Sequence, residues 1–161
     1  MDMLKRLTSI KLFFAVFISA GFIQIQAQNL SSKDIVDVSA SVTGKSDLVL
    51  TVTLEIKEGW HINSNKPLDE FLTPTSISLS DSSIFSNIKT EFPAPEIVKL
   101  GFSDTELSLY QYQAVIKMIL TPGKNIKTNG LKIEGSILYQ PCNDKTCLFP
   151  AKKPFSAELK N

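Results

Sequence analysis

The chain has 161 residues, of which 43% are hydrophobic and 20% charged, and 17 basic against 16 acidic side chains give a formal net charge of +1 at pH 7. This composition supplies enough apolar material for one folded domain and excludes a chain that is disordered throughout. Because the charge is nearly balanced and the sequence has no basic patch, we expect neither nucleic acid nor an anionic lipid surface as a partner.

Residues 1–27 are predicted to be a secretory signal peptide. Basic residues near the start are followed by an apolar run over 12–23 and by a short polar stretch that ends at Ala27. The apolar run is shorter than the roughly 20 residues that a permanent membrane-spanning helix needs. We therefore expect cleavage after Ala27 or Gln28 and a periplasmic or secreted mature protein, with an uncleaved membrane anchor as the alternative.

The remainder, residues 28–161, has the alternating pattern of β-strands. Every second residue is apolar along three long segments, residues 48–56, 110–120 and 131–140. This period of two is typical of half-buried strands. Shorter strands are predicted in residues 35–42, 76–79, 84–89 and 155–159. The polar stretch 93–108 is predicted to be a long loop, and loops of that length are often functional.

Seven or so strands, each with one apolar face, bury those faces most simply by stacking two antiparallel sheets. We therefore predict an all-β fold with a single domain, an immunoglobulin-like antiparallel β-sandwich over residues 28–161. A small closed barrel is the alternative, because periodicity does not distinguish the two closures.

Both cysteines lie in the segment YQPCNDKTCLFP, residues 139–150. Asn143 and Asp144 are turn formers, so the segment is predicted to form the tip of a hairpin. A hairpin would bring Cys142 and Cys147 within bonding distance, and an exported protein meets an oxidising compartment. We therefore predict a Cys142–Cys147 disulfide.

The spacing alone leaves the role of this bond open. Closing so short a ring stabilises a fold by only about 2 kcal/mol, so the bond is a weak staple. An exchanging pair needs two adjacent, accessible sulfurs, and Lys145 between them would favour the thiolate. The alternative is a non-enzymatic secreted binding module with a structural hairpin disulfide. No metal is expected, since two cysteines and the single His61 do not complete a zinc site.

Three segments carry a resemblance to a known family: GWHINSNKP (residues 59–67), LYQYQAVIKM (residues 109–118) and YQPCNDKTCLFP. Together they resemble the N-terminal periplasmic domain of the thiol:disulfide interchange protein DsbD, over roughly residues 35–160. The most specific element is the pattern Y-Q-x-C-x4-C-x-x-P, which ends at Pro150.

The resemblance implies an immunoglobulin-like sandwich whose Cys142–Cys147 pair takes electrons from a thioredoxin-like protein and passes them to oxidised periplasmic clients. Cys147 would join the partner and Cys142 would resolve the mixed disulfide. Full-length members continue into a membrane conduit and a thioredoxin-like domain, whereas this sequence stops at Asn161. We therefore expect a separate membrane reductase or thioredoxin-like donor, and no small-molecule cofactor.

The resemblance also implies a cap loop and a pocket around the cysteines. The matching loop is residues 101–109, in which Phe102 would shield the disulfide until a partner displaces it. His61 and Asn63 occupy positions that line the pocket in the family. From the residues alone, Phe102 is equally well an ordinary loop anchor, and His61 a half-exposed strand residue.

Overall fold

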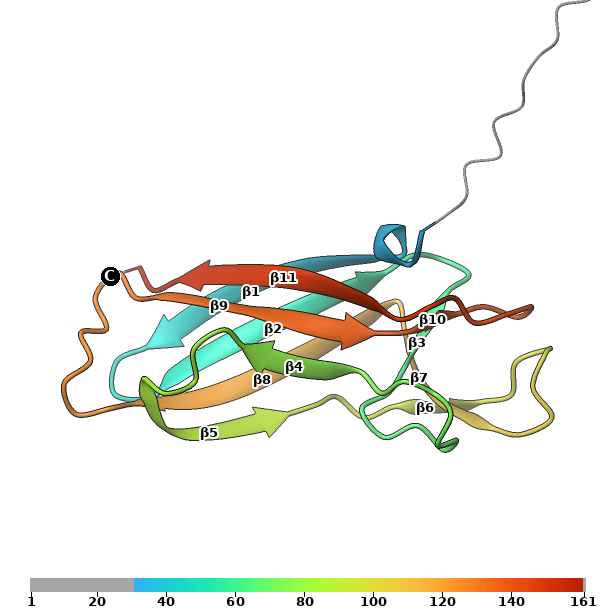
Figure 1. The fold of residues 1–161 in the computed structure, drawn as a ribbon, viewed down its shortest axis with the longest axis horizontal. Coiled ribbons are helices and arrows are strands. Elements are labelled where there is room, and N and C mark those ends of the chain that lie inside the picture. The colour runs from blue at the N-terminus through green and yellow to red at the C-terminus, as the bar shows by residue number, and fades with distance from the viewer. Residues whose placement is uncertain (1–30, 161) are drawn as a thin grey trace, which may run out of the picture.

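The computed structural model describes residues 31–160, which form an all-β domain of eleven strands after one short 3-10 turn, η1 (Ser32–Asp34) (Figure 1). The strands are β1 Val36–Gly44, β2 Leu48–Ile56, β3 His61–Asn63, β4 Ser76–Leu79, β5 Phe85–Glu91, β6 Glu96–Val98, β7 Leu107–Gln111, β8 Gln113–Pro122, β9 Lys132–Tyr139, β10 Pro141–Cys142 and β11 Ala151–Glu158. The predicted signal peptide lies outside the described residues. Within the described range, no helix is long and apolar enough to cross a membrane.

The strands form three antiparallel sheets. The first has the order β1-β2-β8-β5 and the second the order β11-β9-β4, and the main hydrophobic core is built from both. The third sheet, β10-β3-β7-β6, lies at one end of the sandwich, on the right in Figure 1. The predicted immunoglobulin-like β-sandwich is confirmed. The third sheet contains Cys142, in β10, and Cys147 pairs with Cys142 beside it.

Strand β2 is one of the two inner strands of the first sheet and matches the predicted segment 48–56. It pairs with β1 on one side and β8 on the other. Its apolar side chains are buried at every second position: Leu48, Leu50, Val52, Leu54 and Ile56. Each such side chain contributes about 1.5–3 kcal/mol by leaving water, so this strand is a principal source of stability.

The predicted continuous strand over 110–120 is wrong, because the chain changes sheets in the middle of it. β7 belongs to the third sheet and β8 to the first. Tyr112 lies between them with φ 59° and is 66% exposed, although the alternation placed it inward. Its carbonyl oxygen accepts a hydrogen bond from Ile56 N at 2.7 Å. Tyr110 and Ala114, the nearest buried residues on either side of Tyr112, keep the same parity, so the periodicity gave no sign of the break.

The predicted long loop over 93–108 is also corrected. It contains β6, which pairs with β7 through Val98 and Leu107, among others. The loop that remains is residues 99–106, between these two strands. β6 is a three-residue strand at the edge of its sheet, and only Val98 is partly buried, so it carries no alternating pattern.

Close packing at the centre of the second sheet gives a stability prediction. A Cβ atom on Gly135 in β9 would lie 2.4 Å from both the Phe155 ring and the Ser78 carbonyl oxygen. Gly135→Ala is therefore expected to lower the free energy of unfolding in urea by about 1–3 kcal/mol. Gly123→Ala is the control, because its Cβ would lie 3.4 Å from the nearest atom, the Ile84 carbonyl oxygen. Equal losses in the two variants would contradict the described packing.

Candidate active site

The two cysteines form a disulfide across a hairpin, as predicted. The S–S distance is 2.07 Å and the two Cα atoms are 3.9 Å apart. Two backbone hydrogen bonds flank the pair: Asn143 N to Thr146 O at 2.9 Å and Leu148 N to Pro141 O at 2.8 Å. Cys142 and Cys147 are therefore a non-hydrogen-bonded cross-strand pair, the position at which opposed residues of antiparallel strands approach most closely. The backbone of the hairpin thus sets the two sulfurs beside each other.

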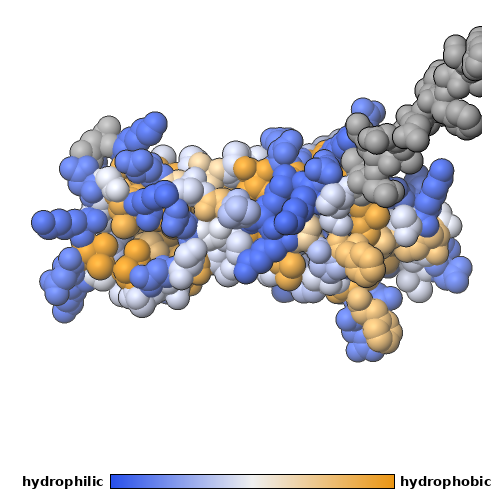
Figure 2. Space-filling model, turned by 45° about the horizontal axis from the view of Figure 1, so that its top comes forward, coloured by the Kyte–Doolittle hydropathy of each residue, from blue (hydrophilic) through white to orange (hydrophobic). Residues whose placement is uncertain are grey.

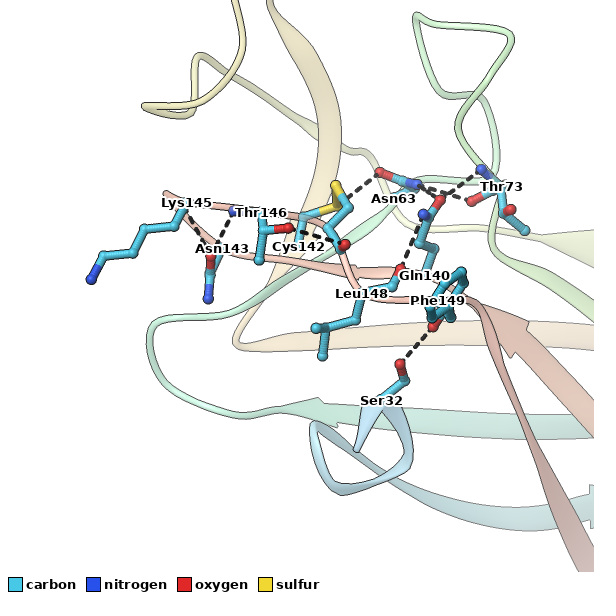
Figure 3. The surroundings of a disulfide bond; sticks show 11 residues. Ser32, Asn63, Thr73, Gln140, Cys142, Asn143, Lys145, Thr146, Leu148 and Phe149 are labelled. Carbon is cyan, nitrogen blue, oxygen red and sulfur yellow. Dashed lines mark hydrogen bonds between the residues drawn. A yellow bond between two sulfur atoms is a disulfide. The ribbon is translucent and has the colours of Figure 1, made fainter. Parts of the chain in front are cut away.

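The hairpin turn is stabilised by the Asn143 side chain. Its Oδ1 accepts hydrogen bonds from the backbone N–H groups of Lys145 at 2.9 Å and Thr146 at 3.0 Å (Figure 3). This side-chain mimic of a turn is the reason that asparagine favours such positions. The Lys145 side chain is exposed and points away from the disulfide in Figure 3. The expected support of a thiolate by this lysine therefore has no basis in the arrangement.

The two cysteines differ in exposure. Cys142 is fully buried and belongs to a small hydrophobic cluster, separate from the main core, with Leu100, Leu107 and Leu109. Cys147 packs against this cluster but is only partly buried. A protein that approaches the hairpin would therefore meet Cys147 before Cys142.

The loop 99–106 lies against the cysteine hairpin. A Cβ atom on Gly101 would be 2.9 Å from the carbonyl oxygen of Asp144, so the glycine permits a close backbone approach. Leu100 is 3% exposed and contributes to the cluster around Cys142, whereas Phe102 is 42% exposed. The sequence drew attention to Phe102 as the nearest aromatic residue and missed Leu100, whose apolar side chain next to a glycine was the available signal.

His61 lies directly opposite Cys142 in the pairing of β3 with β10, so their side chains share a face of the third sheet. Its Nε2 is 2.9 Å from Gln111 Oε1, and Gln111 in turn donates to Glu96. Its Nδ1 is buried without a hydrogen-bond partner among the described residues. The structure therefore places the half-buried His61 beside the disulfide. Residues 31–160 contain no group of three or more side chains arranged to hold a metal ion.

Asn63 is fully buried, and its side chain reaches the disulfide. Its Oδ1 is 3.9 Å from Cys142 Sγ, and its Nδ2 donates to Thr73 O and to Gln140 Oε1, both at 3.1 Å (Figure 3). Gln140 also accepts from Thr73 N at 2.9 Å and donates to Leu148 O at 3.1 Å. These bonds tie β3, the following loop and the cysteine hairpin together. The sequence indicated Asn63 but not the contacts of Gln140 or Thr73.

Tyr139 anchors the strand that leads into the cysteine hairpin. The residue is fully buried, and its hydroxyl donates a hydrogen bond to Ser32 O at 3.2 Å. Burial, with smaller contributions from the negative charges of Asp34 and Asp37, raises the pKa of Tyr139 to about 12. The phenol is therefore neutral in the folded protein up to strongly alkaline pH.

A family model covers almost all of the described chain. The family described as thiol:disulfide interchange protein DsbD, N-terminal, matches residues 26–159. None of the curated proteins compared with this chain matches its sequence.

Two solved structures are similar to this fold. The N-terminal periplasmic domain of ScsB from Proteus mirabilis has a TM-score of 0.54 and 15% identity, and the match covers 75% of this chain but only 44% of that one. The N-terminal domain of DsbD from Neisseria meningitidis, in the reduced form, has a TM-score of 0.54 and 15% identity, with 83% of this chain and 92% of that one covered. At these identities the likeness establishes the shared fold.

The raised pKa of Tyr139 predicts a loss of stability in alkali. The folded-state pKa of about 12 lies above the unfolded value of about 10, so the neutral phenol stabilises the fold below pH 10 and this contribution is lost as the pH rises towards 12. Tyr139→Phe is expected to cost about 1 kcal/mol at pH 8 through its lost hydrogen bond. Between pH 10 and 12 its unfolding free energy should fall less steeply than that of the unmodified protein.

Urea unfolding at pH 8, 10 and 11.5 measures this difference. Tyr110→Phe is a matched comparison, because burial also raises the pKa of Tyr110, whose hydroxyl donates to Asn65 Oδ1 at 2.7 Å. Parallel pH profiles for the Tyr139→Phe variant and the unmodified protein would show that Tyr139 does not titrate with unfolding.

The approach of Gly101 to Asp144 predicts that the loop 99–106 controls access to the sulfurs. Gly101→Val forces the loop off the hairpin, and overpacking of this kind costs about 1–3 kcal/mol. Reduction of the disulfide by a small dithiol such as dithiothreitol should then be at least about fivefold faster. Lys99→Ala, an exposed change on the same loop, is the control and should leave the rate unchanged. An unchanged rate in Gly101→Val would mean that the loop does not restrict access.

Proposed function

The chain belongs to the DsbD N-terminal family, and from this membership we propose that it is an exported thiol:disulfide exchange module that reacts through Cys142 and Cys147. The observation that carries the proposal is the position of the disulfide, on a hairpin at one end of the sandwich with one cysteine partly exposed. A disulfide placed to staple the fold would be expected to join distant segments instead, because longer closed loops gain more stability.

The proposed reaction moves two electrons and two protons from this domain to a client. The reduced domain begins as two thiols, and the Cys147 thiol loses its proton to water. The thiolate then attacks one sulfur of a client disulfide, which forms a mixed disulfide and releases the other client sulfur as a thiolate. Cys142, after losing its own proton, attacks the Cys147 sulfur and releases the second client thiolate. Both client thiolates take up protons, and the domain is left with its Cys142–Cys147 disulfide.

The assignment of Cys147 as the sulfur that joins the partner rests on exposure. Cys142 is fully buried, whereas Cys147 is partly exposed. In both directions of the exchange, a sulfur of the partner must come into line with the sulfur of this domain that it bonds. The more exposed cysteine is therefore the one that an external partner reaches first. Cys142 lies within bonding distance and resolves the mixed disulfide.

The end of the molecule that carries the disulfide offers a surface for a protein partner. Among the described residues, every exposed large hydrophobic side chain except Ile88 lies on or beside the third sheet: Leu68, Phe71, Ile97, Phe102, Tyr112 and Phe149. Figure 2 shows hydrophobic side chains at this end of the molecule, on the right, as well as at the opposite end and along the middle. Exposed apolar groups of this kind are typical of protein interaction sites. In this proposal Phe102 on the cap loop shields the sulfurs, and a docking protein displaces it.

The proposed partners are proteins of two kinds. A thioredoxin-like donor or a separate membrane reductase re-reduces the disulfide by the reverse exchange, and oxidised periplasmic proteins are the clients.

The periplasm is the proposed location, since a secretory signal is predicted in residues 1–27 and the similar ScsB domain is periplasmic. His61 and Asn63 line the cysteine pocket, and the exchange needs no small-molecule cofactor.

Trapping of the mixed disulfide tests the proposal. Cys142→Ser removes the resolving sulfur of this domain, so Cys147 should displace thionitrobenzoate and form a stable covalent adduct with a thioredoxin-like protein whose own resolving cysteine is replaced by serine and whose remaining cysteine carries thionitrobenzoate as a mixed disulfide. Cys147→Ser, the matched control, leaves only the buried cysteine and should give little adduct. The adduct is measured by non-reducing electrophoresis and mass spectrometry. Failure of Cys142→Ser to form any adduct, while both variants remain folded, would favour the non-enzymatic binding module with a structural disulfide.

A further inference from the structure

The orientation of the Asn63 amide is fixed by backbone groups whose hydrogen-bonding roles are unambiguous. The Thr73 N–H is a donor, so the Gln140 atom that it contacts is the oxygen Oε1. The Leu148 carbonyl is an acceptor, so the Gln140 atom next to it is the nitrogen Nε2. Asn63 faces two acceptors, Thr73 O and Gln140 Oε1, so the atom that contacts them is Nδ2. Its oxygen Oδ1 must therefore face Cys142 Sγ.

This oxygen lacks a donor in the disulfide form. Asn63 is 0% exposed, and among the described residues the sole hydrogen-bond contact of Oδ1 is Cys142 Sγ at 3.9 Å. A disulfide sulfur carries no proton, so it cannot donate to Oδ1. The free thiol of the reduced form carries an S–H group, which is a hydrogen-bond donor. A buried acceptor without a donor is unfavourable, and reduction would supply the missing donor.

We propose that Asn63 tunes the Cys142–Cys147 pair towards its reduced form, because Asn63 Oδ1 accepts a hydrogen bond from the Cys142 thiol that the disulfide cannot provide. This inference rests on the proposed exchange function. In the reductive half-reaction, the disulfide takes up two electrons and two protons, and one of these protons binds Cys142 Sγ and is donated to Asn63 Oδ1. Any contact present only in the dithiol makes the disulfide easier to reduce.

The same contact distinguishes the two cysteines of the reduced protein. A hydrogen bond donated by a thiol stabilises the protonated form of that group. Cys142 is therefore kept as the thiol, and Cys147 is left as the sulfur that ionises and attacks a client. The asymmetry of roles then has two causes, the greater exposure of Cys147 and the acceptor beside Cys142.

Equilibration with reduced and oxidised glutathione tests the proposal on the intact protein. Asn63→Leu keeps a side chain of similar size and removes the acceptor, so the equilibrium constant for reduction should fall roughly fivefold or more, the worth of one hydrogen bond. Ser64→Ala is the matched control: Ser64 is the next residue, equally buried, and its hydroxyl bonds Ser108 Oγ at 2.8 Å. Ser64→Ala should destabilise the fold but leave the redox equilibrium unchanged.

The possible results separate this inference from the proposed function. If glutathione does not reduce the unmodified protein, the exchange function itself fails. If the unmodified protein equilibrates and Asn63→Leu has the same constant, the role of Asn63 is overturned while the exchange function stands. An equal shift in Ser64→Ala would also overturn it, because the effect would then come from general loosening of the site.

A spectroscopic measurement that keeps Asn63 covers the case in which Asn63→Leu fails to fold. The chain has only two cysteines, so Cys147→Ser leaves the Cys142 thiol as the single source of an S–H stretching band. In the Raman spectrum we expect this band at the lowered frequency of a hydrogen-bonded thiol. A band at the frequency of a free thiol in apolar surroundings would overturn the proposal.

Discussion

The cross-strand pairing of Cys142 and Cys147 is the constraint on which the site depends. The backbone hydrogen bonds of the hairpin hold the two residues at a position where opposed Cα atoms are naturally close, here 3.9 Å apart. The bond can therefore open and re-form while the strands stay in register. The Gln140 side chain, bonded to Leu148 O and Thr73 N, fixes the base of this hairpin to the rest of the domain.

The sandwich supports this hairpin from one end. Strand β3 pairs with β10 on one side and with β7 on the other, so the cysteine strand becomes the edge of the third sheet. The outer face of that sheet carries His61 and Asn63 next to Cys142, and the loop 99–106 closes over it through Leu100. The main core lies elsewhere, between the first two sheets, which lets the site change its covalent state without disturbing the packing that stabilises the fold.

Features of the fold and of the site could be predicted from the sequence where the residues that determine them lie close together in the chain. The alternation of β2 and the turn residues between the cysteines each lie within ten residues, and both the strand and the disulfide are confirmed. The change of sheet at Tyr112 and the edge strand β6 were missed, because neither alters the pattern of apolar residues. The hydrogen bond of Asn63 to Gln140 spans 77 residues, so only the folded chain reveals it.

The reduction potential of the Cys142–Cys147 disulfide in the intact protein tests the central claim most directly. It is obtained by equilibration with a dithiol buffer of known potential, with the thiol form quantified by alkylation and mass spectrometry. An exchanging disulfide should have a potential clearly above about −300 mV and equilibrate within the time of the experiment. A potential below that value, or a bond that strong dithiols leave intact in the folded protein, would mean that the disulfide is structural.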